Sequence, residues 1–198
     1  DQLRPAWNLA VDQRPDLVAA PTDAAGVAAA VAEASRAGLR VAMQGTGHSA
    51  AAYGSLEGAM LIRTGALDEI SIDRDARRAR VGAGVVWGPV VERAGRENLA
   101  ALAGSAHDVG VVGYSLGGGV GWLARKYGLA SDRVTAAEIV TADGELRRVD
   151  ADHDPDLLWA LRGGGGSFGA VTALEFELLP VHRLYAGALF FPFERAEE

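Results

Sequence analysis

Residues 104–130, "GSAHDVGVVGYSLGGGVGWLARKYGLA", contain eight glycines interleaved with valine, leucine and tryptophan. Flexible linkers do not carry apolar residues in this way, so the stretch belongs to a folded domain. A glycine-rich turn next to a helix offers free backbone N–H groups and the positive end of the helix dipole, and both suit a pyrophosphate group. The stretch therefore predicts a cofactor site of the nucleotide type.

A second glycine-rich loop, "QGTGHS" at residues 44–49, follows the apolar run "LRVAM". Glycine costs backbone entropy, so such a loop needs backbone angles or a close approach that other residues forbid. It carries one imidazole, on His48, and a neutral imidazole nitrogen is a nucleophile. We expect a ligand to approach this loop within reach of His48.

Composition excludes several classes of protein. The 198 residues suit one sizeable domain or two lobes, and a net charge of −7 without a basic stripe argues against a nucleic-acid surface. The sequence contains no run of about 18 apolar residues, so it predicts no membrane-spanning helix. Because cysteine is absent, disulfides, thiolate catalysis and cysteine metal sites are excluded, and we expect no metal. Because no signal peptide is visible, we expect a cytoplasmic protein. The chain starts at Asp1 rather than at methionine, so the question of an upstream segment is left open.

The first third of the chain alternates helix and strand patterns. Thr22 can cap a helix that closes at Gly38, and the apolar positions of this helix share one face: Val27, Ala30, Val31 and Ala34. Strands are predicted at 39–43 and 59–63, on either side of the histidine loop. This order favours parallel pairing, so we predict a small parallel α/β lobe over residues 1–65.

From residue 69 the pattern changes to hairpins. "EISID" and "RARVG" alternate with period two around "RDAR", and Asp143-Gly144 is a tight-turn signal between two further strands, at 135–142 and 145–150. Helices are predicted from Pro89, over 89–99, and from Asp154-Pro155, over 155–162, and a last alternating strand covers 170–179. We predict a larger lobe over residues 66–185, with an antiparallel sheet and helices, and the fold class α+β.

The pentapeptide "GYSLG" supports a competing hypothesis, a serine hydrolase that uses Ser115. Asp143 or Asp150, followed by His153 or His182, would supply the acid and base in the right order. The antiparallel hairpins around the motif and the glycines after Leu116 argue against it, because the nucleophile elbow needs a mostly parallel sheet and a stiff helix. The P-loop and Rossmann signatures are both absent.

Several long motifs occur in an order that resembles one family: "WN" at 7–8, "RPDLVAAPTDAAGVAAAV", "GTGHS", "VGVVGYSLGGGVGWLARKYGLASDRV", "VTADGE" and "LLWALRGGGGSFGAVTALEFEL". They look like the FAD-binding, PCMH-type domain of the berberine-bridge-enzyme-like FAD-linked oxidases, within the vanillyl-alcohol-oxidase superfamily. The match covers residues 4–180. It implies a two-lobed FAD domain of an oxidase that moves hydride from an alcohol, sugar or amine to flavin, which dioxygen then reoxidises.

The resemblance implies that His48 forms a covalent bond to the flavin 8α carbon, while the glycine loops wrap the cofactor. Carried across position by position, the cofactor contacts are Gln44, Gly45, Thr46, Gly47, His48, Ser49, Gly104, Ser105, Val109, Gly110, Gly113, Tyr114, Gly117, Gly118, Gly121, Trp122, Ile139 and Val140.

This chain departs from the family pattern at two positions. Ala106 stands where many relatives carry a cysteine that attaches the flavin a second time, so double attachment is impossible. Gln44 replaces an arginine common in relatives, which removes one positive charge near the phosphates. Val109 stands at a position where, in the family, a small branched residue admits oxygen. Its presence favours an oxidase over a dehydrogenase.

In the family a substrate domain follows the flavin domain and supplies the catalytic base. Residues 186–198 resemble the start of that domain, so we expect a fragment of a longer enzyme, and no catalytic residue can be assigned. A flavin-binding remnant without turnover is the third hypothesis.

Overall fold

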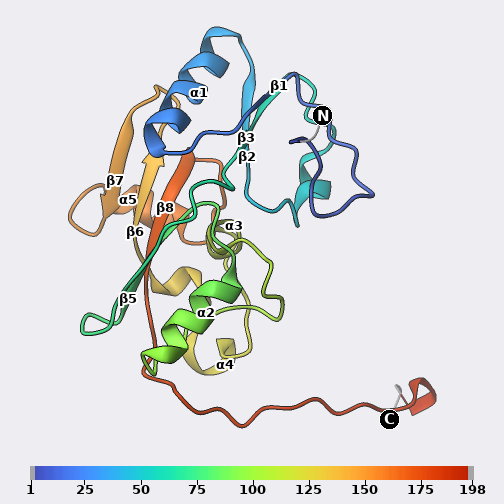
Figure 1. Ribbon diagram of the computed structural model, residues 1–198, viewed down its shortest axis with the longest axis vertical. Helices are drawn as coiled ribbons and strands as arrows, with labels where there is room; N and C mark the ends of the chain where they lie inside the picture. Colours follow the sequence, from blue (N-terminus) through green and yellow to red (C-terminus); the bar gives the residue numbers. More distant parts are fainter. Residues whose placement is uncertain (1–2, 196–198) are drawn as a thin grey trace.

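The computed structural model describes residues 3–195 and contains two β-sheets (Figure 1). The small sheet is parallel, with the order β1-β3-β2, and its strands are β1 Leu17–Ala19, β2 Arg40–Gln44 and β3 Ala59–Arg63. The large sheet is antiparallel, with the order β4-β5-β8-β6-β7, and its strands are β4 Ile70–Asp73, β5 Arg78–Gly82, β6 Val134–Val140, β7 Leu146–Asp150 and β8 Ala170–Glu177. The predicted fold class is confirmed.

Helices cover the sheets and fill the connections between strands. The α-helices are α1 Ala24–Arg36, α2 Trp87–Arg96, α3 Val111–Leu116, α4 Ala124–Tyr127 and α5 Pro155–Leu161. Short 3₁₀ turns are η1 Ala50–Tyr53, η2 Ser131–Arg133 and η3 Phe193–Arg195. Within residues 3–195, no helix has the length and apolar character needed to cross a membrane.

Helix α1 packs against both sheets. Its buried face is the predicted one, formed by Val27, Ala30, Val31 and Ala34. This face shares one apolar cluster with Met60 of β3 and with Val140 of β6 and Ala170 of β8. Because one helix contributes to the cores of both lobes, the lobe boundary near residue 65 stays a prediction.

The start of α1 differs from the sequence prediction by one residue. Asp23, not Thr22, is the N-cap: its backbone is extended and its carboxylate accepts a hydrogen bond from the N–H of Gly26 at 2.7 Å. Both residue types cap helices well, so a pattern of apolar positions does not choose between neighbours.

Helix α2 begins at Trp87, before the predicted start at Pro89, and no side chain caps it. Instead, the N–H groups of Trp87 and Gly88 donate to the carbonyls of Val109 and His107, at 3.1 and 2.8 Å. These acceptors lie far along the chain, so no local pattern marks this helix start. The same bonds anchor the loop before α3 to the first turn of α2.

Both predicted hairpins are present, with Ile70 opposite Val81 in β4–β5 and Gly144 at a φ of +83° in the β6–β7 turn. The last strand is shorter than predicted and does not alternate cleanly, because residues 170–174 are all buried. Strand β8 lies between β5 and β6, with Ala170 against α1 and Val171 in the main core. A central strand covered on both faces loses the alternation of a half-exposed one.

Candidate cofactor site

The histidine loop, residues 45–49, leaves the end of β2 and is covered by the N-terminal segment. Gly47 has a φ of +87°, and a Cβ there would lie 2.7 Å from the Cβ of Ala6. The N–H of Trp7 donates to the carbonyl of Thr46 at 2.9 Å. Glycine at 47 is therefore required by the left-handed backbone angle and by the close approach of the N-terminal segment.

Three side chains surround the His48 imidazole. The Thr46 hydroxyl lies 2.8 Å from Nδ1, and the indole of Trp7 stacks on the ring with centroids 4.2 Å apart and planes 19° apart. The Asp108 carboxylate lies 3.8 Å from Nε2 and accepts a hydrogen bond at 3.0 Å from the Trp7 indole N–H. These residues, Trp7, Thr46 and Asp108, form what we call the His48 clamp.

The clamp leaves one atom unpaired. Nε2 of His48 is buried and has no hydrogen-bond partner in the described part of the chain. Buried polar atoms are nearly always paired, so an orphaned imidazole nitrogen shows that the surroundings of His48 are incomplete within the described residues.

The two glycine-rich stretches meet beside this clamp. A Cβ at Gly110 would lie 3.8 Å from the hydroxyl oxygen of Thr46. Gly110 precedes α3, whose first residue, Val111, donates its N–H to the carbonyl of Val85 at 2.9 Å. The structure thus brings together the predicted residues 44–49 and the start of the second predicted stretch.

The side chain of Tyr114, on α3, lies close to two of the glycines, Gly104 and Gly121. A Cβ at Gly104 would lie 3.0 Å from the Tyr114 ring, and one at Gly121 would lie 3.1 Å from its hydroxyl and 2.2 Å from the carbonyl of Ala103. The hydroxyl is buried without a partner among residues 3–195, and burial raises the pKa of Tyr114 above its usual value. Gly104 and Gly121 therefore make room for this phenol.

The three remaining glycines among the predicted cofactor contacts fall into two kinds. Gly113 lies on the exposed side of α3, and a Cβ there would meet no atom within 4 Å. Gly117 and Gly118 follow the helix rather than lead into it, and Gly118 has a φ of +102°. Only at Gly113 does the structure show open space without backbone strain.

The other predicted contacts lie at varied depths. Gln44 is buried, with its amide nitrogen 3.5 Å from the carbonyl of Pro5, whereas Ser105 is exposed and Val109 packs on the main core. Trp122 is 77% exposed. It lies in the segment between α3 and α4 and is not part of the His48 clamp.

Ile139 and Val140, predicted to meet the adenine end, are buried at the end of β6. Their backbones pair with β7 on one side and β8 on the other, with a register shift between Glu138 and Ile139. The extra residue at this bulge is Thr172 of β8, so Ile139 and Val140 keep partners in both neighbouring strands.

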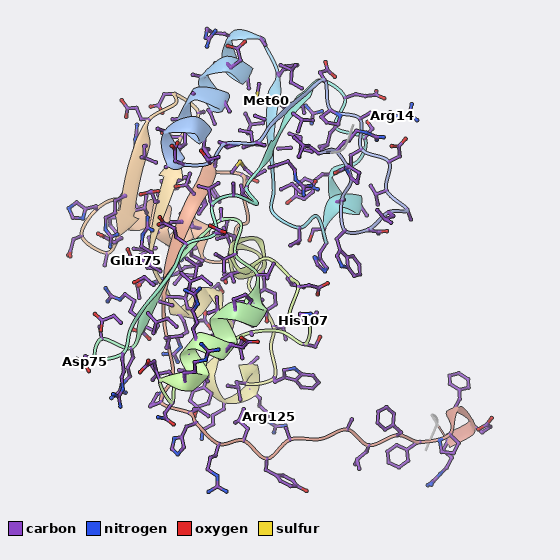
Figure 2. The ribbon with its side chains drawn as sticks, viewed as in Figure 1. Arg14, Met60, Asp75, His107, Arg125 and Glu175 are labelled. Atoms are coloured by element: carbon purple, nitrogen blue, oxygen red, sulfur yellow. The ribbon has the colours of Figure 1, made fainter. Side chains whose placement is uncertain are left out.

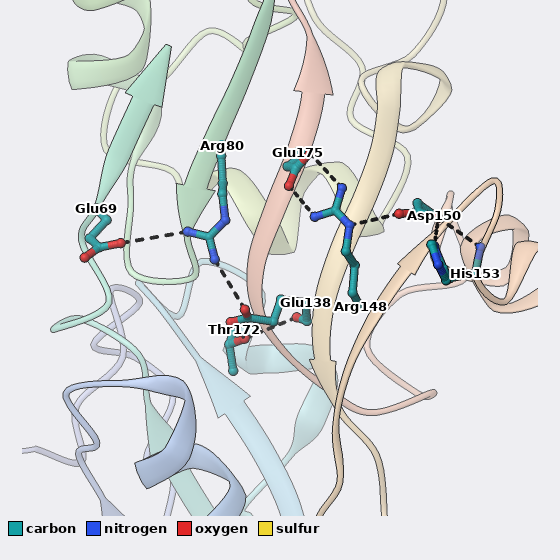
Figure 3. Close-up of polar contacts among 8 residues, drawn as sticks. All are labelled: Glu69, Arg80, Glu138, Arg148, Asp150, His153, Thr172 and Glu175. Carbon is teal, nitrogen blue, oxygen red and sulfur yellow. Dashed lines mark hydrogen bonds and ion pairs between the residues drawn. The ribbon is translucent and has the colours of Figure 1, made fainter. Parts of the chain in front are cut away.

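The geometry does not support a serine hydrolase. Ser115 lies inside α3 and is only 2% exposed, so its hydroxyl is not presented at a turn. Its proposed partners Asp150 and His153 instead belong to a network of charges on the outer face of the large sheet, with Arg148 and Glu175 (Figure 3). The core residues of β8 face α3, and this network lies on the opposite face.

Sequence reasoning missed two members of the clamp, Trp7 and Asp108. "WN" was recognised only as a motif, and Asp108 was passed over within "GSAHDVG". The contacts of Trp7 with Asp108 span 101 residues, so no local spacing predicts them. An acidic residue inside a glycine-rich stretch was the available signal.

The residues present fit a flavin nucleotide. Two glycine loops lie side by side, α3 has open space at Gly113, and His48 and Tyr114 each hold a buried polar atom without a partner in the described residues. A planar ring could lie against the open side of α3 at Gly113, and an anion could bind the backbone N–H groups of the glycine loops.

A family comparison decides the identity of the fold. The family described as "FAD binding domain" matches residues 15–150 of this chain. The chain belongs to this family. Its domain is of the PCMH type found in berberine-bridge-enzyme-like FAD-linked oxidases, as the motifs predicted.

Named relatives agree with this assignment. The chain is 38% identical over 183 residues to (R)-6-hydroxynicotine oxidase of Paenarthrobacter nicotinovorans, covering 92% of this chain and 40% of the relative. It is 32% identical to the structure of BBE-like 1 from Physcomitrella patens, with a TM-score of 0.84, covering 89% of this chain and 39% of that one.

A third similar structure concerns flavin attachment. It is glucooligosaccharide oxidase from Acremonium strictum, 35% identical with a TM-score of 0.80, covering 89% of this chain and 38% of that one. The FAD of that enzyme is described as 6-S-cysteinyl, 8α-N1-histidyl FAD. The chain spans about two fifths of the length of these relatives.

Proposed function

We propose that this chain is the FAD-binding part of an oxidase, in which a small-molecule substrate reduces the flavin and dioxygen reoxidises it. Family membership supports the cofactor, and the named oxidases among the relatives support the reaction class. The observation that carries the proposal is the His48 clamp: a histidine in a glycine loop, held on three sides, with one buried nitrogen unpaired among residues 3–195.

The two glycine stretches would hold the cofactor. Backbone N–H groups of residues 45–49 and of the segment around Gly110 would bind the diphosphate, the open side of α3 at Gly113 would receive the flavin, and the end of β6 at Ile139 and Val140 would meet the adenine. When bound, the flavin supplies the two-electron chemistry, and the protein binds, orients and shields it.

Attachment would be through a single covalent bond, from His48 to the 8α carbon. His48 is the only imidazole of the loop, and Ala106 cannot provide the cysteinyl bond named for the Acremonium enzyme. A single bond prevents cofactor loss and makes the flavin a stronger oxidant.

Substrate binding and the catalytic base would come from the rest of the protein. The chain spans two fifths of its relatives. Residues 181–195 leave the body as an extended segment (Figure 1). Its aromatic side chains are exposed, including Phe190 at 92%. We propose that residues 186–198 begin the substrate domain; residues 196–198 lie outside the described residues.

The test is a denaturing mass measurement of the whole protein, with His48→Ala as the variant and His107→Ala as the matched control. Wild type and His107→Ala should carry the mass of one FAD on the peptide "GTGHSAAAYG", and His48→Ala should release FAD on denaturation. Flavin released freely from wild type contradicts covalent attachment. A colourless native protein that binds no added FAD contradicts the cofactor itself.

A redox measurement separates the oxidase from a remnant without turnover. After photoreduction under anaerobic conditions, admission of air should restore the oxidised flavin spectrum within seconds to minutes. A flavin that stays reduced in air argues against dioxygen as the acceptor.

A further inference from the structure

The two nitrogens of His48 have different surroundings. Nδ1 points to the Thr46 hydroxyl at 2.8 Å, and Thr46 lies beside Gly110, where the two glycine stretches meet. Nε2 is buried on the other side, with the Asp108 carboxylate at 3.8 Å. Nδ1 therefore lies on the side of Thr46, where the two glycine stretches meet, and Nε2 lies on the side of Asp108.

The carboxylate decides which nitrogen carries the proton of the neutral ring. An Nε2–H dipole points its positive end at Asp108, whereas an Nε2 lone pair would face the negative carboxylate at the same distance. The Thr46 hydroxyl does not oppose this choice, because a hydroxyl can donate to Nδ1 or accept from it. The Nε2–H form is the electrostatically favoured tautomer, and in it Nδ1 keeps the ring lone pair and accepts a hydrogen bond from the Thr46 hydroxyl.

Trp7 holds the carboxylate in the orientation that this argument needs. Its indole N–H donates to one Asp108 oxygen at 3.0 Å, and the other oxygen is the one nearest Nε2. The same indole stacks on the imidazole, so ring and carboxylate are fixed by one side chain. Indole N–H only donates, so this contact also requires an acceptor at 108.

We propose that Asp108, oriented by Trp7, is a positioning residue that holds His48 as the Nε2–H tautomer and leaves Nδ1 as the nitrogen that bonds to flavin. This inference rests on the proposed function. Asp108 acts through His48 and does not itself touch the reacting carbon.

Formation of the bond between His48 and flavin is a two-electron oxidation, and dioxygen is the oxidant. A C–N bond from Nδ1 replaces one C–H bond of the 8α-methyl group, and the methyl proton and the Nε2 proton leave. The two electrons pass through the flavin to dioxygen, which takes both protons and becomes hydrogen peroxide. Positive charge develops on the imidazole as Nδ1 bonds, and the Asp108 carboxylate beside Nε2–H stabilises it.

The first experiment measures attachment in the whole protein. Protein made without riboflavin is mixed with FAD, and the covalent fraction is followed by denaturing mass spectrometry. Asp108→Ala should slow attachment by at least about tenfold while non-covalent FAD affinity changes by less than about twofold. Trp7→Phe, which keeps an aromatic ring but removes the N–H donor, should give an intermediate rate.

The matched control is Asp75→Ala. Asp75 is an exposed carboxylate at the tip of the β4–β5 hairpin, far across the molecule from His107, the neighbour of Asp108 (Figure 2). It should attach FAD at the wild-type rate. An unchanged rate in Asp108→Ala overturns the proposal. If Asp108→Ala fails to fold, as judged by circular dichroism, Asp108→Asn replaces it with the same criterion.

The second measurement identifies the bonded nitrogen. The flavin peptide is digested to histidylriboflavin and compared with standards alkylated at Nδ1 and at Nε2. The Nδ1 isomer is expected from wild type, and the Nε2 isomer overturns the proposal.

A third measurement needs no flavin and so separates this inference from the proposed function. Selective ¹⁵N-histidine labelling of the FAD-free protein, with His48→Ala to assign the signals, reports the tautomer from the two ring nitrogen shifts. Wild type should show Nε2–H, and Asp108→Ala should shift the ring toward a mixture. A dominant Nδ1–H form in wild type overturns the proposal even if FAD attaches, and Nε2–H supports it even if FAD never attaches.

Discussion

Two histidine–aspartate pairs in this molecule differ in every respect except composition. His153 and Asp150 lie three residues apart, with Nδ1 2.8 Å from a carboxylate oxygen and the imidazole 70% exposed. That hydrogen bond is the main cause that lowers the pKa of Asp150 to about 2. His48 and Asp108 come from distant segments, lie 3.8 Å apart, and leave a buried nitrogen unpaired among residues 3–195.

The pair with the shorter distance and the shifted pKa, His153 and Asp150, is the one that does not belong to the candidate cofactor site. His153 and Asp150 belong to a surface network in which Arg148 also bonds to Asp150 and Glu175, so its charges are satisfied by one another (Figure 3). Surface pairs of this kind form from local sequence and mark no chemistry. The fold instead leaves two buried polar atoms without partners among residues 3–195, Nε2 of His48 and the hydroxyl of Tyr114, and such incompleteness is typical of a binding site.

The largest effect is expected from filling the open space. Gly113→Val places a branched side chain where no protein atom lies within 4 Å, so the protein should fold but bind FAD at least about 100-fold more weakly. Gly95→Val is the matched control, because Gly95 is also an exposed helical glycine with open space around it, on α2. FAD titration followed by fluorescence measures both. Normal FAD affinity in Gly113→Val would place the cofactor elsewhere.

An intermediate effect is expected at the orphaned phenol. Tyr114→Phe removes a buried hydroxyl that has no partner in the described chain, so the FAD-free protein should gain about 1 kcal/mol of unfolding free energy. If FAD supplies the missing partner, the same change should weaken FAD binding by about tenfold. Urea unfolding and FAD titration give the two values.

Tyr53→Phe is the control, since Tyr53 is 63% exposed and its hydroxyl has water available. It should leave both quantities unchanged. A Tyr114→Phe variant that loses stability without FAD would show that its hydroxyl already has a partner within the protein.

The smallest effect is expected at the satisfied pair. Because the folded-state pKa of Asp150 is depressed from 3.8 to about 2, its contribution to stability is present above the ordinary value and is lost as pH falls toward 2. Asp150→Asn should therefore lower the urea midpoint at pH 7, and the difference from wild type should shrink as pH falls and vanish below about pH 2. FAD binding should not change.

Asp152→Asn, on the same turn, serves as the control and should have a smaller effect at pH 7. An Asp150→Asn deficit of equal size at both pH values would mean that the carboxylate charge is not what stabilises this turn. A loss of FAD in Asp150→Asn would erase the contrast between the two pairs.

The sequence predicted what short-range patterns encode. Period-two alternation predicted β4 and β5, and Asp143-Gly144 predicted the turn between β6 and β7. The glycines on either side of His48 singled out that residue. Helix α2 was misplaced because its first N–H groups bond to the distant carbonyls of Val109 and His107 rather than to a side-chain cap. The prediction that β8 alternates cleanly was wrong, because α1 packs on its second face at Ala170. Only the tertiary fold reveals this contact.

The candidate site was predicted in its loops and missed in its contacts. Residues 44–49 and Gly110 were expected together and meet in the structure. Trp7 and Asp108 were not expected, because their role depends on long-range geometry and not on spacing. Whether the predicted cofactor contacts hold FAD is left to the titrations above.

The indole-to-carboxylate bond of the clamp also has a consequence for the order of events during folding. It closes a loop of 101 residues, and closing so long a loop costs chain entropy that only later packing recovers. A nascent chain therefore cannot orient Asp108 against His48 until the histidine loop, α2 and the segment before α3 have all reached their places. If His48 bonds to flavin as proposed, attachment has to wait for this late event, and an unfinished or misfolded chain lacks the geometry for it.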